Sequence, residues 1–165
     1  MSVTHIVGVD PGLVHTGVVR MVFDPQHHEI IVEHEAVIGP NANSVVAWAR
    51  ESKIKPYWQA PTCFIEGYRP RSNFNTDKRM TQAVSNMHQA LPGSKVLDNT
   101  GVKKVVRRQL MQLLGVWTFG TPTHHDDLRS AARIALLGML KDEQTNQLLA
   151  DVVRDHLAGK TWTVK

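Results

Sequence analysis

The sequence contains a single cysteine, Cys63. A disulfide within the chain and a zinc site built on several cysteines are therefore excluded. No run of about 18 apolar residues is present, which excludes a membrane-spanning helix. Residues 1–5 do not combine a basic segment with a following apolar run, so they lack the form of a secretory signal. We therefore expect a cytoplasmic protein that has no membrane partner.

Aromatic residues are few, at 6% of the chain, and neither sign of charge dominates, with 19 Lys and Arg against 15 Asp and Glu. The apolar share of 42% over 165 residues fits one domain, spanning residues 1–165, with its own hydrophobic core. The basic residues nevertheless gather in two patches, within 69–79 and 103–108: Arg69, Arg71, Lys78 and Arg79, then Lys103, Lys104, Arg107 and Arg108. Such patches are typical of a surface that follows phosphates, and a solvated helix face explains either patch alone equally well.

Hydrophobic periodicity and turn residues predict one mixed sheet with helices on its faces. The first three strands are joined by short turns and form an antiparallel meander, and the last two strands alternate with helices. The basic segment that follows Gly101 is predicted to be one helix as far as Leu114. The predicted strands are 4–9, 16–23, 29–36, 62–65 and 95–97, and the predicted helices are 44–51, 77–91, 102–114, 126–140 and 143–156.

Acidic residues stand at the ends of two predicted strands and at the start of one predicted helix. Asp10 follows an apolar strand within Gly8-Val9-Asp10-Pro11-Gly12, and Glu66 closes Cys63-Phe64-Ile65. The helix is preceded by His124-His125-Asp126-Asp127, in which positions 124 and 127 share a face. Simpler interpretations are a hairpin turn, an exposed strand-end glutamate and a pair of helix-capping carboxylates.

Gathering these acids in one place is costly unless a cation lies among them, because like charges repel and raise each pKa. Oxygen ligands suit Mg²⁺, with Mn²⁺ as a substitute, and a two-metal site of this kind serves in-line cleavage of phosphodiesters. A histidine in the set serves as a ligand or as a proton-transfer group. The predicted metal ligands are Asp10, Glu66, His124, Asp126 and Asp127.

Two further features point to nucleic acid. Tyr68 and Phe74 lie among the basic residues of the first patch, where they would stack on or wedge beside unpaired bases; packing in the core is an equally good interpretation. The predicted helix after Gly101 has cations in its first turns, against the preference of the helix dipole, so an anion is expected there.

Several short segments together resemble the RuvC family of Holliday-junction resolvases. The family pattern is an apolar strand, Gly-x-Asp-Pro-Gly and a following Thr-Gly, then an acid that closes a second strand. A small residue followed by lysines opens a DNA-contacting helix, and an Asp or His stands three residues before an Asp that starts an alanine-rich helix. The matching segments are residues 6–17, Phe64-Ile65-Glu66, Gly101-Val102-Lys103-Lys104 and His124-x-x-Asp127 with the helix that follows it.

The resemblance implies an RNase H-like α/β fold with a mixed five-stranded sheet, three strands antiparallel and then two parallel. It also implies a homodimer that nicks four-way DNA junctions symmetrically with Mg²⁺. Compact members of the family occur in bacteriophages, which would place the protein in the host cytoplasm. Carried over by position, the catalytic residues are Asp10, Glu66, His124 and Asp127, with Lys103 or Lys104 supporting the scissile phosphate.

The sequence departs from the family pattern at two places. Asp126 is an additional acid that competes with Asp127 for one role, and Asp127 is favoured because it stands three residues after His124. The segment 67–71 is more polar than the family's apolar run with its aromatic wedge, so the wedge and the sequence preference are open.

Three other functions are compatible with parts of the sequence. The same site would serve an RNase H-like nuclease acting on RNA in a hybrid or on other branched DNA. A non-catalytic nucleic-acid-binding module would use the basic patches alone, and an actin-like phosphotransferase would need a second domain that is not visible. The tryptophans are expected in the core or at a dimer interface. A family-like dimer interface is expected on residues 78–91. Whether a helicase partner assists is not indicated by the sequence.

Overall fold

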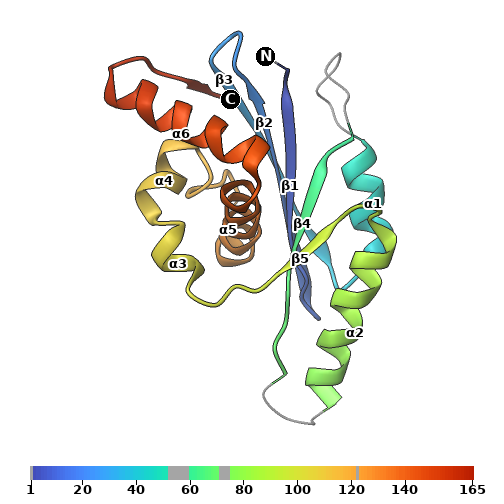
Figure 1. The fold of residues 1–165 in the computed structure, drawn as a ribbon. Helices are drawn as coiled ribbons and strands as arrows, with labels where there is room; N and C mark the ends of the chain where they lie inside the picture. The colour runs from blue at the N-terminus through green and yellow to red at the C-terminus, as the bar shows by residue number, and fades with distance from the viewer. Residues whose placement is uncertain (1, 52–59, 71–74, 122) are drawn as a thin grey trace.

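A computed structural model describes residues 2–51, 60–70, 75–121 and 123–165, and it shows one sheet with helices on both faces (Figure 1). The strand order is β5-β4-β1-β2-β3-β6. Neighbours β1, β2 and β3 run antiparallel, whereas β4 and β5 run parallel to β1. The strands are β1 (Thr4–Asp10), β2 (His15–Asp24), β3 (Glu29–Ile38), β4 (Thr62–Glu66), β5 (Lys95–Leu97) and β6 (Thr163–Val164).

The predicted α/β fold is therefore confirmed, and the five predicted strands form one mixed sheet in which three strands are antiparallel and two are parallel, as expected. The strand count was wrong by one, because β6 adds a sixth strand parallel to β3. The Thr163 amide donates to the His28 carbonyl (2.8 Å) and the Lys165 amide to the Ile30 carbonyl (2.9 Å). A two-residue strand is too short to show alternation, so its sequence carries no signal.

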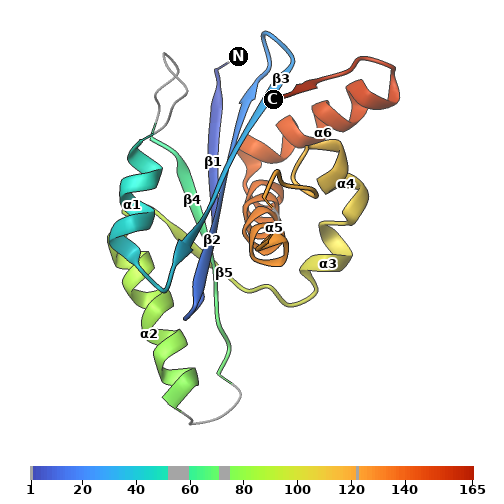
Figure 2. The same ribbon diagram turned by 180° about the vertical axis from the view of Figure 1, so that it is seen from behind.

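Of the helices in the described ranges, two cover one face of the sheet and four lie on the other (Figures 1 and 2). The first face carries α1 (Ala42–Arg50) and α2 (Asn75–Ala90) over a core that includes Val7, Val18 and Ile65. The larger core lies on the second face, beneath α3 (Val102–Val105), α4 (Arg108–Leu113), α5 (His125–Lys141) and α6 (Glu143–Leu157). Among the described residues, no helix is both long and apolar enough to cross a membrane.

The helix α5 lies unusually close to the sheet because glycine faces it. A Cβ added at Gly8 of β1 would overlap the backbone oxygen of Ala131, and one added at Gly17 of β2 would stand 2.5 Å from the backbone oxygen of Asp127. Ala131 and Ala135 are fully buried at this contact. The small residues thus let α5 approach the sheet, and they fix the height of its first turn.

The basic segment after Gly101 is not the single helix that its sequence predicted. It forms α3 and α4, separated by Val106 and Arg107, whose backbone is not helical. Val106 is fully buried in the larger core, so the break serves to insert this side chain. Lys103 and Lys104 consequently lie within the single turn of α3, which is too short for a helix dipole to distinguish its two ends, so the expected long helix with cationic first turns does not occur.

Three of the four tryptophans lie in the described residues and pack as predicted. Trp162 is buried in the larger core, Trp117 packs against the same core, and Trp48 packs against the smaller one. Trp58 lies outside the described residues.

Candidate functional site

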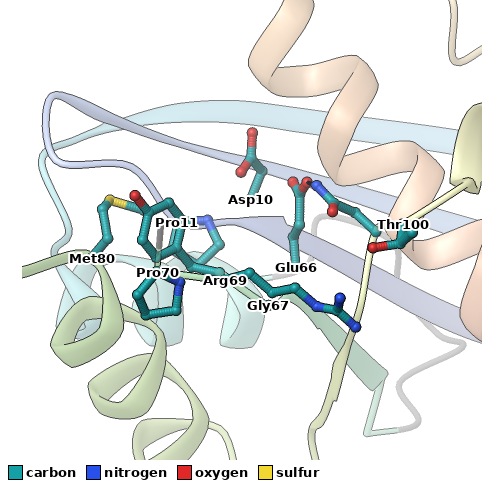
Figure 3. A pocket seen from close by; sticks show the side chains of 10 residues that line it. Asp10, Pro11, Glu66, Gly67, Arg69, Pro70, Met80 and Thr100 are labelled. Carbon is teal, nitrogen blue, oxygen red and sulfur yellow. Dashed lines mark hydrogen bonds between the residues drawn. The ribbon is translucent and has the colours of Figure 1, made fainter. Parts of the chain in front are cut away.

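Two carboxylates meet at one edge of the sheet because their strands are parallel neighbours. Val9 of β1 is paired with Ile65 of β4, and Asp10 and Glu66 are the next residues of the two strands. Their side chains lie next to one another in the cleft (Figure 3). The two carboxyl groups are close enough to share a hydrogen bond, which keeps the proton on Asp10. The strand ends therefore bring these two predicted site residues together.

A third carboxylate, on α5, is near enough for its charge to act on this pair. Asp127 lies in the first turn of that helix, and its backbone packs on Gly17, which is the residue paired with Asp10 across β1 and β2. The charge of Asp127 acts on Asp10. A side chain at position 17 would push this turn away from the sheet, so the glycine of the Thr-Gly motif explains how helix and strand acids converge.

The pKa of Asp10 is raised by its burial and by the neighbouring carboxylates. Partial burial, the charge of Glu66, its hydrogen bond to Glu66 and the charge of Asp127 together raise the pKa of Asp10 from 3.8 to about 9, with burial the largest cause. The protein without a cation thus holds a proton on Asp10 at neutral pH. A divalent cation would replace that proton and relieve the repulsion between the carboxylates.

Among the described residues, no three His, Cys, Asp or Glu side chains stand close enough, as they are, to hold a metal ion. The donor set is nevertheless one of carboxylate oxygens, which suits Mg²⁺ or Mn²⁺ and does not suit zinc. Rotation of the Asp127 side chain toward the pair of Asp10 and Glu66 is the change that metal binding would require.

His124 stands beside Asp127 at the start of α5. Its backbone adopts φ of 65°, a left-handed conformation that is uncommon outside glycine and is found at functional sites. The Nδ1 atom lies 3.6 Å from the Asp127 Oδ2 atom. The ring of His124 also lies against that of His15, with centroids 4.1 Å apart. His15 was missed by sequence reasoning, although it stands two residues before Gly17 and so on the same face of β2.

The adjacent residues of the His-His-Asp-Asp segment point elsewhere. The Asp126 side chain is fully exposed, and its carboxylate lies 3.8 Å from Arg129 rather than near Asp10. The His125 Nε2 atom is hydrogen-bonded to the Thr121 carbonyl at 2.6 Å. The charge of Asp127 therefore acts on Asp10, and His124 lies beside Asp127, whereas Asp126, which the sequence also marked as a ligand, lies in solvent. Asp127 and His124 line neither of the two cavities that contain Glu66.

Asn99 is a second residue that the sequence analysis did not mark. It follows β5, whose last residue, Leu97, is paired with Glu66, and its Nδ2 atom donates a hydrogen bond to the Glu66 Oε1 atom. The amide of Gly67 donates to the Leu97 carbonyl at 2.8 Å, which ties the two strand ends together. The available signal was its position just beyond the end of a parallel strand, where open sheets place functional groups.

Two cavities flank this pair and share it. The first, of about 680 Å³, contains Asp10, and the second, of about 440 Å³, contains cationic side chains; Glu66 and Asn99 line both. Figure 3 shows the first cavity, with Asp10 and Glu66 near its centre, Met80 at the left and the Arg69 side chain extending below Glu66. Together the cavities form one cleft with an acidic half and a basic half. The second cavity is lined by Glu66, Asn99, Gly101, Val102, Lys103, Lys104, Ser130, Arg133 and Ile134.

The predicted DNA-binding residues lie at different distances from this cleft. Lys103 and Lys104 line the second cavity, and Arg69 lines the first while it forms an ion pair with Asp98. Hydrogen bonds from Thr100 and the charge of Arg69 hold the pKa of Asp98 below its usual value. The remaining described basic residues are exposed and line neither cavity: Lys78 and Arg79 on α2, and Arg107 and Arg108 beside α4.

The two aromatic candidates have different outcomes. Tyr68 is partly buried, packs against the smaller core and donates a hydrogen bond to Asp77, and it also lines the first cavity. Both of its interpretations therefore retain support. Phe74 and the basic residue Arg71 lie outside the described residues.

Comparison with known proteins finds likeness at the level of structure. No profile of a known protein family and no curated protein sequence matches the chain. T. thermophilus RuvC in complex with a Holliday junction substrate aligns with TM-score 0.49 and 18% identity, over 82% of this chain and 91% of that one. The large terminase nuclease domain of bacteriophage SPP1 with bound Mn aligns with TM-score 0.46 and 10% identity, over 84% and 86%.

The large terminase nuclease of thermophilic phage G20c aligns with TM-score 0.33 and 12% identity, over 82% of each chain. At these identities the likenesses concern the fold, and the roles of individual residues depend on the geometry described above.

Proposed function

We propose that the protein is a divalent-metal-dependent DNA endonuclease that resolves four-way junctions by symmetric nicking. The observation that carries this proposal is the pair of Asp10 and Glu66 at adjacent strand ends, where burial first, then the charge of Glu66 and its hydrogen bond, and last the charge of Asp127 raise the pKa of Asp10 to about 9. Strongly perturbed carboxyl groups in a cleft are typical of functional sites, and the basic half of the same cleft is suited to a polyanion.

In this proposal Asp10, Glu66 and Asp127 hold the metal, with His124 as a further ligand or proton-transfer group. Bound Mg²⁺ or Mn²⁺ would supply an activated water and would stabilise the charge that develops on the phosphate. Asn99 holds the Glu66 carboxylate in place through its Oε1 atom. Asp127 faces the Nδ1 atom of His124, so proton transfer by this ring would use Nε2.

The substrate is proposed from the charge of the cleft. Lys103 and Lys104 lie beside Glu66 and would neutralise phosphates at the scissile position, whereas Arg69 would do so on the other side of the acids. Symmetric nicking of a junction needs two sites, so we propose a homodimer that uses the exposed face of α2 within residues 78–91. Sedimentation of the purified protein tests the dimer, and a monomer at micromolar concentration would refute it.

The activity is tested by incubating the protein with a labelled four-way junction in Mg²⁺, in Mn²⁺ and in Ca²⁺. A flap, a plain duplex and an RNA–DNA hybrid are run beside it, so that the pattern of nicks identifies the substrate. We expect paired nicks near the branch point with Mg²⁺ or Mn²⁺. Absence of nicks with every metal and substrate would refute the proposal, and preferential cutting of the hybrid would transfer it to an RNase H-like activity.

Matched variants separate catalysis from folding. Asp10→Asn and Glu66→Gln are expected to lower the nicking rate by about 1,000-fold or more, because each removes a metal ligand, while junction binding in Ca²⁺ changes little. Asp126→Asn removes the same charge from an exposed position next to Asp127 and serves as the control. Equal losses in Asp126→Asn and Asp10→Asn would show that net charge, and not the site, is responsible.

A further inference from the structure

One cationic side chain of the cleft is left unexplained by the proposed metal site. Arg133 of α5 lines the second cavity with Lys103, Lys104 and Ser130. Its Nε atom is buried and has no hydrogen-bond partner in the described part of the chain. A buried donor without a partner destabilises the fold, so its retention calls for a compensating contact that the protein alone does not provide.

The surroundings of Arg133 hold it near other cations. Its guanidinium lies 5.6 Å from the centroid of the Trp117 ring, and those of Arg129 and Arg108 lie 3.9 and 4.8 Å from the same centroid. Arg129 is occupied, because its Nε atom donates to the Trp117 carbonyl at 2.7 Å. Arg133 therefore stands beside a like charge, with its own Nε unsatisfied.

The cavity offers the binding groups that a phosphate requires. Arg133, Lys103 and Lys104 contribute three cations to its wall against the single carboxylate of Glu66, and Ser130 contributes a hydroxyl. A guanidinium presents a planar set of N–H donors that matches two phosphate oxygens. The volume of about 440 Å³ exceeds that of one phosphate group and accommodates a phosphodiester with its sugar.

We propose that this cavity is a subsite for a non-scissile phosphate of a nucleic-acid strand, and that Arg133 is the residue that binds it. The inference rests on the proposed function for its substrate class, but it assigns a position within the cleft that the metal site does not. Glu66 stands at the boundary between the two cavities, so the strand passes from the acid pair at Asp10 to the cationic wall at Arg133. The subsite thereby fixes where the strand lies relative to the metal.

Binding without metal tests the subsite independently of cleavage. Affinity for a fluorescent four-way junction is measured in EDTA at several salt concentrations for wild type, Arg133→Met and Arg133→Lys. Arg133→Met is expected to weaken binding about 10-fold and to lower the slope of log K against log[salt] by about 1, because one phosphate contact is lost. Arg133→Lys keeps the charge and loses the planar donors, so its slope is expected to stay near that of wild type while its affinity falls.

The matched control is Arg154→Met on α6, which removes one exposed positive charge far along the chain from the cleft. It reports the effect of net charge alone. Thermal unfolding of all variants identifies any that fail to fold, and in that case Arg133→Lys, which preserves packing on Trp117, provides the decisive comparison.

A second measurement identifies the phosphate itself. Junctions that carry a single uncharged methylphosphonate at successive positions around the branch point are bound to wild type and to Arg133→Met. We expect one position at which neutralising the phosphate weakens wild type about 10-fold and leaves the variant unchanged, because the partner of that phosphate is already missing. If the variant responds to every methylphosphonate as wild type does, the subsite is refuted.

The two proposals fail in different ways. A protein that shows the position-specific effect but cuts no substrate would retain the phosphate subsite and lose the nuclease function. A protein that cuts junctions but shows additive effects at every position would retain the nuclease and lose the role of Arg133.

Discussion

Replacing Asp10 with asparagine is expected to stabilise the metal-free protein while abolishing its activity. The pKa of Asp10 is raised to about 9 in the folded protein, against 3.8 as the ordinary value. A carboxyl whose pKa is raised by folding contributes stability fully at pH below about 4, and the contribution is lost as the pH rises through about 9. The asparagine side chain of the variant carries no charge at any pH, and its amide can donate to Glu66 as the protonated acid does.

The size of the effect follows from the linkage between proton binding and folding. Each pH unit between the two pKa values changes the free energy of unfolding by about 1.4 kcal/mol. Between the unfolded pKa and pH 7 the loss therefore reaches at most roughly 4 kcal/mol, and solvent screening at this partly exposed carboxyl lowers it. Since roughly 1 kcal/mol shifts the melting temperature of a domain of this size by 2–4 °C, we expect Asp10→Asn to melt several degrees above wild type at pH 7.

The assay is thermal unfolding in EDTA from pH 4 to pH 9, for wild type, Asp10→Asn and the exposed control Asp126→Asn. The difference between Asp10→Asn and wild type should vanish near pH 4 and grow with pH, whereas Asp126→Asn should follow wild type throughout. Saturating Mg²⁺ should stabilise wild type and reduce the difference, by about 2.7 kcal/mol at 100 times the dissociation constant. If Asp10→Asn were less stable than wild type at pH 8, the carboxylates would not be in electrostatic conflict and the basis of the metal site would be wrong.

The same geometry supports three further predictions. Mg²⁺ binding should release close to one proton per chain below pH 9, because the cation displaces the proton of Asp10; calorimetry in buffers of different ionisation enthalpy measures it, and no proton release would contradict the raised pKa. Gly17→Ala should lower the nicking rate at least 10-fold, because the added Cβ would stand 2.5 Å from the backbone oxygen of Asp127 and displace the first turn of α5. An unchanged nicking rate would show that this turn does not position the Asp127 carboxylate. Asn99→Ala should lower kcat at least 5-fold while junction binding stays constant, since it frees the Glu66 carboxylate; Asn99→Gln should recover part of the rate, and an equal loss in binding would assign Asn99 to DNA contact instead.

The sheet and the convergence of the strand-end acids were predictable for one physical reason. Adjacent parallel strands end at the same edge, so acids that close β1 and β4 must be neighbours once the apolar runs are assigned to strands. The alanines of α5 indicated a helix that could lie close to the sheet and so bring Asp127 toward the strand ends, whereas the part of Gly17 in this contact became visible only in the structure.

The features that the sequence did not predict depend on how loops and short helices pack against the core. Arg133, Asn99 and His15 acquire their neighbours from other parts of the chain, and nothing in their local sequence marks them. The break between α3 and α4 arises because burying Val106 outweighs the local preference of the segment for helix. The choice between Asp126 and Asp127 likewise depends on which side of α5 faces the sheet. The three-residue spacing to His124 favoured Asp127, and the structure shows that Asp126 is the more exposed of the two side chains.

The helix α5 carries Asp127 near its start and Arg133 six residues later, on one rigid rod seated against glycines of the sheet. A cation that draws Asp127 toward Asp10 and a phosphate that draws Arg133 into its cavity therefore act on the same body. Binding of either ligand then favours binding of the other. Thermodynamic reciprocity requires that bound metal raise the affinity for DNA by the same factor by which bound DNA raises the affinity for metal. Such a protein would load its ions firmly only once a strand is in the cleft, which confines hydrolysis to the engaged substrate.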